Sequence, residues 1–341
     1  MTYSSIPTST SSPGYRENWM ERLTAQVPEF SSRPLTSIAF PGSHDSGTSS
    51  ISSQSSLLRD SPYRFLANIP VIGSCCVKPV IARWSLTQDL NVAEQMENGI
   101  RFFDFRVAQG NASNGLPDRN FFLCHALIAD PLAPALEAVA QFVEKHPYEV
   151  IFLDFKKFYD WEQNSDNSLI DLIKETVGPY LYPYDASKPL SDVTPTSIRE
   201  MKKTVILIYH KQSVTDVYKD FWPENSIVSP WIDTTCPHTL VTSLCDNLKA
   251  GRPKNSFYVS QCVLTPVAST VLKSVCCCCS PHCHGPRDLR EMAQEAREPI
   301  LEWLSKNDTA RQDINIAISD FVDADKFAFI DAIIGLNVSR F

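Results

Sequence analysis

Apolar residues in this chain gather in short runs rich in β-branched and aromatic side chains, and these runs predict strands. They cover residues 35–40, 99–107, 120–124, 149–155, 204–209, 226–231, 256–261 and 314–319. Several are apolar almost throughout, which is typical of strands covered on both faces in a parallel sheet. The pattern therefore predicts eight strands of a largely parallel sheet.

Segments with apolar residues at helical spacing lie between these runs. They cover residues 15–27, 88–98, 132–145, 166–177, 213–221, 238–250, 288–305 and 324–336. A length of 341 residues allows one large barrel or two ordinary domains. The repeated alternation of strand and helix favours an α/β fold, a single distorted β/α barrel of the TIM type.

Three segments fall outside the alternation. Residues 1–14 are rich in Ser, Thr and Pro and predict a short disordered tail, which leaves one barrel domain over residues 15–341. Residues 52–84 form a long first crossover, and residues 275–286 interrupt the path from the seventh strand to the next helix. The tail lacks the pattern of a secretory signal, and no apolar run reaches the roughly 20 residues of a spanning helix. We expect a cytoplasmic protein without a transmembrane segment.

Charge narrows the range of partners. The formal net charge is −8, and the sequence pI is about 5.4. Nucleic-acid binding needs a basic surface, so this balance argues against nucleic acid as the main partner. It also argues against a purely electrostatic attraction to anionic membranes.

Eleven cysteines are expected to be reduced thiols, because no secretory signal precedes them. Four of them, Cys276 to Cys279, form an unbroken run close to Cys283 and two histidines. The run is compatible with an unmodified surface loop, with reversible acylation near a membrane, or with a metal site. The possible ligand pairs are too close together for an ordinary zinc finger. The motif alone does not distinguish between the surface loop, the acylation site and the metal site.

The stretch PGSHDSGT at residues 41–48 places His44 and Asp45 directly after the first predicted strand. Gly, Pro and Ser are turn formers and would present the imidazole at the tip of a strand. Taken alone, this motif would be an ordinary solvated turn. Its place at a strand end gives it more weight, because barrel enzymes carry their chemistry there.

Polar side chains follow other predicted strands in the same way. They are Asp104 and Arg106, His125, Asp154 and Lys156, and Asp320. Two imidazoles, several carboxylates and two cations at one rim are what phosphoryl transfer needs: a base, an acid and a cation for the equatorial oxygens. Tyr209, Trp231 and Ser260 close later strands and either contact a substrate or pack at the rim.

Each of these residues also has a structural alternative. Arg106 could pair with Asp104 or Asp45, His125 could be a satisfied buried histidine, and Asp320 could cap the following helix. The functional interpretation is favoured because polar residues of this kind follow several strands. A purely structural explanation would have to be true separately at each of these strand ends.

The motifs PGSHDSGT, GIRFFDFR, FLCH and ISDF resemble the X domain of phosphatidylinositol-specific phospholipase C. More closely, ENWM at residues 17–20 and the spacing to GIRFFDFRV resemble the small X-domain-containing proteins. The resemblance runs from about residue 17 to residue 341. It implies a barrel enzyme of the phosphoric diester hydrolase/lyase kind, which cleaves an inositol phospholipid to diacylglycerol and cyclic inositol phosphate by attack of the substrate's own 2-hydroxyl.

The resemblance also implies roles for five residues. His44 matches the general base, Asp320 the carboxylate that orients it, and His125 the general acid with Asp45 as its hydrogen-bond partner. Arg106 matches the arginine that metal-independent members use where others hold calcium. Lys156, Tyr209, Trp231 and Ser260 are the expected substrate contacts.

We therefore expect no metal cofactor, since two cations at ligand positions would oppose a bound dication. Asp45, Asp104 and Asp154 could still gather Ca²⁺ or Mg²⁺. In this sequence Ala126 follows the second histidine where the family usually has Gly, and Tyr209-His210 stands where bacterial members present an arginine to the inositol ring.

The implied partner is a phospholipid at a membrane surface, reached by peripheral association, with acylation at Cys276–Cys279 as one means of attachment. Two alternatives stay open. One is a catalytically weak barrel that binds inositol lipids or a protein. The other is a metal-dependent enzyme of the glycerophosphodiesterase or sphingomyelinase kind, which activity in chelator would separate from the main interpretation.

Overall fold

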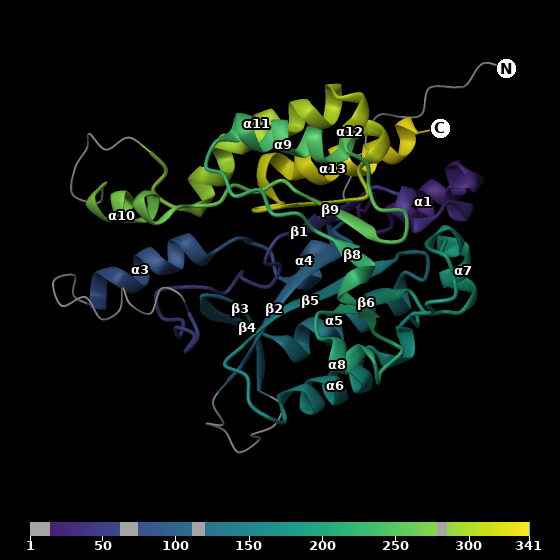
Figure 1. Cartoon of the computed structure of the whole chain (residues 1–341), viewed down its shortest axis with the longest axis horizontal. Helices are drawn as coiled ribbons and strands as arrows, with labels where there is room; N and C mark the ends of the chain where they lie inside the picture. The colour runs from purple at the N-terminus through teal and green to yellow at the C-terminus, as the bar shows by residue number, and fades with distance from the viewer. Residues whose placement is uncertain (1–13, 62–73, 111–119, 278–284, 341) are drawn as a thin grey trace.

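A parallel sheet that curls into a barrel forms the centre of the molecule (Figure 1). The computed structural model describes residues 14–61, 74–110, 120–277 and 285–340. Hydrogen-bonded neighbours follow the order β7-β6-β5-β2-β1-β10-β9-β8, and each pair in this order is parallel. The bounds are β1 (Phe40–Ser43), β2 (Phe102–Gln109), β5 (Ile151–Tyr159), β6 (Val205–Tyr209), β7 (Trp222–Pro223), β8 (Ile227–Val228), β9 (Phe257–Gln261) and β10 (Ile316–Ser319).

The barrel is distorted where its two end strands meet. Within the described residues, β7 and β8 share no ladder, and the 3₁₀ turn Glu224–Ser226 joins them. Both strands have only two residues. The prediction of a strand over residues 226–231 was therefore too long, and β7 was not predicted at all.

One predicted barrel strand has a different place in the sheet. β3 (Phe121–His125) pairs antiparallel with the end of β2, and β4 (Leu127–Pro131) pairs antiparallel with β3. The expectation that residues 120–124 form the third parallel strand was wrong. Only residues 110–120 connect β2 with β3, and a parallel crossover needs a dozen residues or more.

The first strand begins later than the apolar pattern predicted. Residues Leu35–Ser37 form a 3₁₀ turn, and β1 starts at Phe40. Leu35 is held by a backbone hydrogen bond from its N–H to the carbonyl of Val193, at 2.8 Å. The strand therefore runs through Pro41 and Gly42, which brings its carboxyl end directly to His44.

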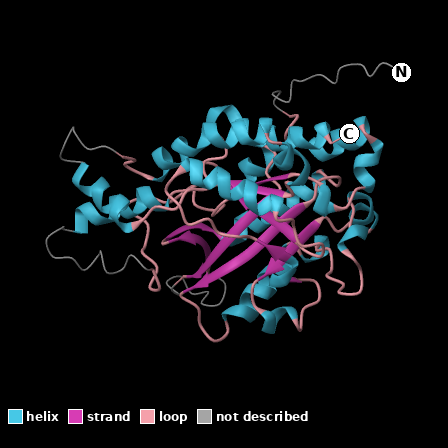
Figure 2. Cartoon of the chain, turned by 45° about the horizontal axis from the view of Figure 1, so that its top comes forward, coloured by secondary structure: helices cyan, strands magenta, loops and turns pink. Residues whose placement is uncertain are grey.

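Helices cover the sheet on both sides (Figure 2). The helix α5 (Leu132–Lys145) has the predicted bounds, because Leu132, Leu136, Val139 and Val143 form one buried stripe. The other predicted helices are α1 (Trp19–Gln26), α4 (Val92–Glu97), α6 (Ser165–Thr176), α8 (Gln212–Thr215), α9 (Pro237–Lys249), α11 (Leu289–Lys306) and α13 (Ala324–Ser339). Of the predicted helix at 213–221, only the start forms, as α8.

Four helices were not predicted: α3 (Ser74–Ser85), α7 (Pro195–Glu200), α10 (Ala268–Cys277) and α12 (Asp308–Asp313). The helix α3 lies almost entirely in the segment 52–84, which was expected to be irregular, whereas α10 mostly precedes the segment 275–286 and shares only its last three residues with it. They project together from the barrel, and Nε1 of Trp84 donates a hydrogen bond to Oγ of Ser274 at 2.9 Å (Figure 1). Residues 1–13 of the expected tail lie outside the described residues.

Aromatic rings fill the barrel interior. Phe40, Phe102, Phe152 and Phe257 are all buried, and the Phe152 ring lies 5.1 Å from Phe40 and 4.9 Å from Phe257 in edge-to-face contacts. Because these rings fill the interior of the barrel, a substrate site can form only at the ends of the strands. None of the described helices is long and apolar enough to cross a bilayer.

Candidate active site

A pocket of about 340 Å³ opens at the carboxyl ends of the parallel strands. This is the rim at which barrel enzymes place their chemistry. Its wall contains seven residues that carry the argument: His44, Arg106, His125, Lys156, Lys157, Trp231 and Asp320.

The ladder between the first and last strands brings His44 beside Asp320. Ser43 pairs with Ser319 across the parallel strands β1 and β10, so the next residue of each strand lies at the same rim. Nδ1 of His44 lies 2.8 Å from Oδ1 of Asp320, and both side chains are buried. Because a carboxylate only accepts, the Nδ1–H donates and leaves Nε2 as the basic nitrogen.

The hairpin β3–β4 brings the second imidazole to the same place. Nδ1 of His125 donates to the carbonyl oxygen of Ser85 at 2.9 Å, so its Nε2 is also the free nitrogen. Gly47 allows this approach, because a Cβ at this position would clash with the side chain of Leu123 on β3. Ala126 has φ of 58°, a left-handed conformation that favours glycine, which gives a physical reason for a glycine after this histidine.

Asp45 lies between the two imidazoles. Its Oδ2 is 3.4 Å from Nε2 of His44 and 3.4 Å from Nε2 of His125. Arg106 forms an ion pair with the same carboxylate, and its Nη2 lies 3.2 Å from Nε2 of His44. The guanidinium and both basic nitrogens thus meet around one buried carboxylate.

This arrangement shifts the pKa values of the site. Burial works against ionisation of Asp45, but Arg106 and the two imidazoles outweigh it and lower the pKa of Asp45 to about 2. Burial lowers the pKa of His44, yet Asp45 and Asp320 together raise it above the ordinary value. Burial also lowers the pKa of His125, and Asp45 offsets this only in part, so the net shift is downward.

A β-bulge sets the positions of the two adjacent lysines. The register between β2 and β5 shifts after Phe105, so that Arg106 pairs with Lys157 and Lys156 is the extra residue. In a regular strand two consecutive side chains would point to opposite faces, whereas here both line the pocket. Nζ of Lys156 lies 3.8 Å from Oδ2 of Asp104. Lys157 was not predicted as a site residue, and only the Lys-Lys pair hinted at it.

Trp231 lies beside the imidazole of His44. Its ring centroid is 5.7 Å from that of His44, and 46% of the residue is exposed. An indole that is half in solvent at the mouth of the pocket fits the predicted contact with substrate.

Two of the predicted substrate contacts do not line this pocket. The hydroxyl of Tyr209 donates to Asp166 on α6 at 2.8 Å, and its ring stacks on Phe221 at 5.7 Å. Ser260 is buried, and its neighbour Gln261 lines the pocket instead. Alternation along each strand separates these faces, and the sequence pattern does not say which face is which.

The buried groups His44, Asp45 and Asp104 have one ligand atom each within 4.8 Å of one another, close enough to consider a metal. Both carboxylates already face a cation, Asp45 the guanidinium of Arg106 and Asp104 the ammonium of Lys156. A divalent ion would have to share these oxygens with two positive side chains, so this donor set fits a metal poorly.

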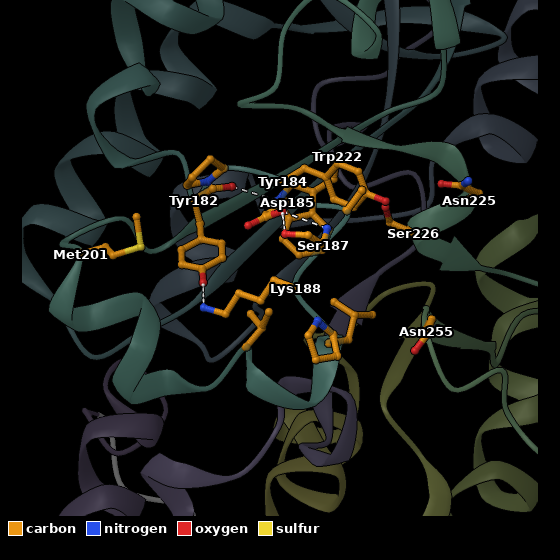
Figure 3. A pocket seen from close by; sticks show the side chains of 15 residues that line it. Tyr182, Tyr184, Asp185, Ser187, Lys188, Met201, Trp222, Asn225, Ser226 and Asn255 are labelled. Carbon is orange, nitrogen blue, oxygen red and sulfur yellow. Dashed lines mark hydrogen bonds between the residues drawn. The ribbon is translucent and has the colours of Figure 1, made fainter.

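A second pocket of about 600 Å³ lies elsewhere, beside β7 and the segment Tyr182–Leu190 (Figure 3). Tyr182, Lys188 and Trp222 are part of its wall, and Nζ of Lys188 donates to the Tyr182 hydroxyl at 2.8 Å. Among the described residues of its wall there is no histidine and no Arg–carboxylate pair. His44, His125, Arg106 and Asp320 all line the smaller pocket.

The chain has close relatives among curated proteins, although it matches no family model. It is 32% identical to PI-PLC X domain-containing protein 3 of Danio rerio over 89% of this chain and 88% of that protein. It is 31% identical to PI-PLC X domain-containing protein 3 of Homo sapiens over 96% of both chains, and 31% identical to PI-PLC X domain-containing protein 2 of Mus musculus over 94% of this chain and 88% of that protein.

Solved structures show the same architecture. Phosphatidylinositol-specific phospholipase C from Staphylococcus aureus, as an H258Y mutant, aligns with a TM-score of 0.61 at 18% identity over 96% of this chain and 98% of that chain. The enzyme from Listeria monocytogenes aligns with a TM-score of 0.59 at 16% identity over 94% and 98%. The fold is therefore the α/β barrel of these phospholipases. At the level of sequence, the chain belongs to the PI-PLC X domain-containing proteins.

Proposed function

We propose that this protein is a phosphoric diester hydrolase of the phospholipase C type, which cleaves an inositol phospholipid into diacylglycerol and cyclic inositol phosphate. The observation that carries the proposal is the meeting of two imidazoles, each 3.4 Å from Asp45, with the guanidinium of Arg106 inside one pocket. The histidines supply a base and an acid, and the arginine supplies positive charge.

In the first step Nε2 of His44 takes the proton of the inositol 2-hydroxyl. The bond from Nδ1–H to Asp320 holds the ring in the required tautomer and stabilises the imidazolium that forms. The deprotonated oxygen attacks the phosphorus of the same molecule. Because the nucleophile belongs to the substrate, no covalent enzyme intermediate is needed, and binding aligns the reacting atoms.

His125 completes the reaction as the acid. Its Nδ1–H is held by the Ser85 carbonyl, so Nε2 carries the proton that passes to the diacylglycerol oxygen as the ester bond breaks. Arg106 stabilises negative charge on the phosphoryl oxygens. Lys156 and Lys157 add positive charge on the β5 side of the pocket.

We propose that this chemistry needs no metal. The support is the cation beside each candidate ligand: Arg106 at Asp45 and Lys156 at Asp104. The guanidinium would supply the charge stabilisation that a metal supplies in other phosphodiesterases.

The proposed setting is a membrane surface that faces the cytoplasm, to which the protein binds peripherally. Trp231 at the mouth of the pocket supports this setting, because a half-exposed indole suits the boundary between water and lipid. Acylation at Cys276–Cys279 stays a prediction: Cys276 and Cys277 end α10, and Cys278 and Cys279 lie outside the described residues.

The deciding experiment offers the purified protein a panel of phosphodiesters with and without excess chelator. The panel contains phosphatidylinositol, phosphorylated phosphatidylinositols, phosphatidylcholine, sphingomyelin and a soluble glycerophosphodiester. We expect cleavage of an inositol lipid in chelator, with a cyclic phosphodiester product seen by ³¹P NMR. A double variant His44→Ala/His125→Ala, purified in parallel, controls for contaminating activity. Binding without cleavage would favour the catalytically weak barrel, and cleavage only with added metal would favour the glycerophosphodiesterase-like alternative.

A further inference from the structure

The ladder between β1 and β10 ends just before the reacting groups. The last register pair is Ser43 with Ser319, followed by one hydrogen bond from the N–H of His44 to the carbonyl of Ser319 at 3.1 Å. Beyond this point the two chains need another support, since an unheld strand tip would let the His44 and Asp320 side chains drift apart.

Gln88 supplies part of that support. It is fully buried in the connection between α3 and α4, and its Nε2 donates to the carbonyl oxygens of His44 and Ser319, each at 2.9 Å. Its Oε1 accepts the N–H of Val322 at 3.3 Å. One amide thus ties the chain at the base to the chain on both sides of Asp320.

Thr87, the residue before Gln88, contacts the two turns that follow His44 and Asp320, at Asp45 and at Phe321. Asp45 and Phe321 both have left-handed backbones, with φ of 42° and 47°, a conformation that costs energy for residues other than glycine. Oγ1 of Thr87 donates to the carbonyl of Asp45 at 2.9 Å. The carbonyl of Thr87 accepts the N–H of Phe321 at 2.7 Å.

The same segment reaches the second histidine. Ser85, three residues before Gln88, provides the carbonyl that accepts Nδ1–H of His125 at 2.9 Å. Ser85, Thr87 and Gln88 are all buried. Gln88 and Thr87 do not line the pocket, so they have no direct route to a bound substrate.

We propose that the segment Ser85–Gln88 is the positioning element of the active site, and that Gln88 holds His44 and Asp320 in register. The proposal rests on the function assigned above to the two histidines. It adds positioning residues that act through the backbone and that no local motif marks.

The test compares two buried amides with the same pattern of hydrogen bonds. Asn315 donates to the carbonyls of Leu35 and Ile38, each at 2.9 Å, and accepts the N–H of Tyr258 at 3.1 Å, away from the site. The variants are Gln88→Met and its matched control Asn315→Leu. For each we would measure kcat and KM on the lipid that the panel identifies, and the pKa of His44 by NMR titration of the imidazole.

We expect Gln88→Met to lower kcat by about 10–100-fold, since a misplacement of about 1 Å costs that much, and to leave KM within about twofold. We also expect the pKa of His44 to fall toward its ordinary value, because the imidazole loses contact with Asp320. Asn315→Leu should leave kcat, KM and the pKa of His44 unchanged, although it removes as many side-chain hydrogen bonds as Gln88→Met does. If Gln88→Met does not fold, Thr87→Val provides the same comparison through the turn at Asp45, whose carbonyl loses the hydrogen bond from the Thr87 hydroxyl.

The NMR titration separates this proposal from the proposed function. If the wild type cleaves none of the lipids, the function fails, while the pKa of His44 in the two variants still decides the positioning role. An unchanged His44 pKa and kcat in Gln88→Met, or equal changes in Asn315→Leu, would overturn the proposal.

Discussion

Nδ1 of His44 lies 2.8 Å from Oδ1 of Asp320, although 276 positions separate the two residues along the chain. They meet because β1 and β10 are neighbours in the sheet. The proposed base and the carboxylate proposed to orient it therefore come from opposite ends of the chain and require the complete barrel. This relationship leads to four predictions in addition to the positioning test.

Replacing either histidine should nearly abolish phosphodiesterase activity. We expect His44→Ala and His125→Ala each to lower kcat by about 10²–10⁴-fold, the usual value of a general acid–base step. A substrate whose leaving group needs no proton should partly rescue His125→Ala and leave His44→Ala inactive. Steady-state rates on both kinds of substrate check this.

The control for these variants is His146→Ala, because this histidine pairs with Glu17 at the end of α5 and does not line the pocket. It should retain wild-type turnover. Near-normal rates in either pocket variant would refute the assigned role.

The pH dependence should identify which histidine holds the proton in the free enzyme. The pKa of His44 is raised and that of His125 is lowered, so in the singly protonated pair the proton resides mainly on His44. The proposed mechanism uses the minor form, in which His125 is protonated and His44 is neutral. The value of kcat/KM should then fall at acid pH, where the pair takes up a second proton, mainly at His125, and both imidazoles are charged. It should also fall at alkaline pH, where the pair loses its remaining proton, mainly from His44.

The variant Asp320→Asn tests this assignment. It removes one of the carboxylates that raise the pKa of His44, so the alkaline limb of the kcat/KM profile should move to lower pH. Asp154→Asn is the control, since Asp154 pairs with His210 and should leave both limbs in place. A shift of the acid limb alone would reverse the two assignments.

Removing divalent ions should leave the wild type fully active, whereas removing the guanidinium should not. We expect Arg106→Ala to lose about 10²–10³-fold in kcat or more, as for other groups that stabilise transition-state charge. Arg106→Lys should retain more activity than Arg106→Ala, because it keeps the positive charge and loses only the planar guanidinium with its paired hydrogen-bond donors. Rates measured with and without excess chelator give the result.

Arg16→Ala is the matched control, because this buried arginine also pairs with an aspartate, Asp331, at 2.7 Å, and does not line the pocket. Its rate should equal that of the wild type. Loss of wild-type activity in chelator would instead make the carboxylates Asp45 and Asp104 metal ligands.

Trp231 should matter more for lipid in a membrane than for a soluble substrate. Apolar area is worth about 25 cal/mol per Å², so removing an indole that is 46% exposed should weaken vesicle binding by about 10–100-fold. We expect Trp231→Ala to lower activity on phosphatidylinositol vesicles by that factor and to affect a soluble glycerophosphodiester less. Vesicle sedimentation and rates on both substrates measure this.

Val217→Ala provides the comparison, because Val217 is 68% exposed and does not line the pocket. It should bind vesicles as the wild type does. Equal losses on soluble and vesicular substrate in Trp231→Ala would mean that the indole acts only on His44 inside the pocket.

Much of the architecture could be predicted from local patterns. The apolar stripe that starts at Leu132 defined α5 to the residue, and the runs over residues 204–209 and 256–261 became β6 and β9 with a change of one residue at most. The helix buries one apolar stripe, and both strands are buried at every position, so the local pattern of apolar residues is enough to predict them. The same patterns placed His44, His125 and Asp320 at strand ends, where the structure also has them.

Other features depend on which segments meet. The length of the link after β2 makes β3 antiparallel, and a bulge beside Arg106 turns both Lys156 and Lys157 into the pocket. Strand alternation gives two faces without saying which one lines the pocket, and for this reason Tyr209 and Ser260 were predicted as substrate contacts that the structure places elsewhere.

The sequence by itself therefore determined the fold class, the family and the residues able to carry acid–base chemistry, because these depend on periodicity and on short motifs. The tertiary structure alone decided how those residues meet: Asp45 between two imidazoles, Arg106 against it, and Gln88 joining the backbone at His44 to that around Asp320. The physical reason is that side-chain direction and long-range pairing are set by partners far away in the chain, and no local pattern contains them.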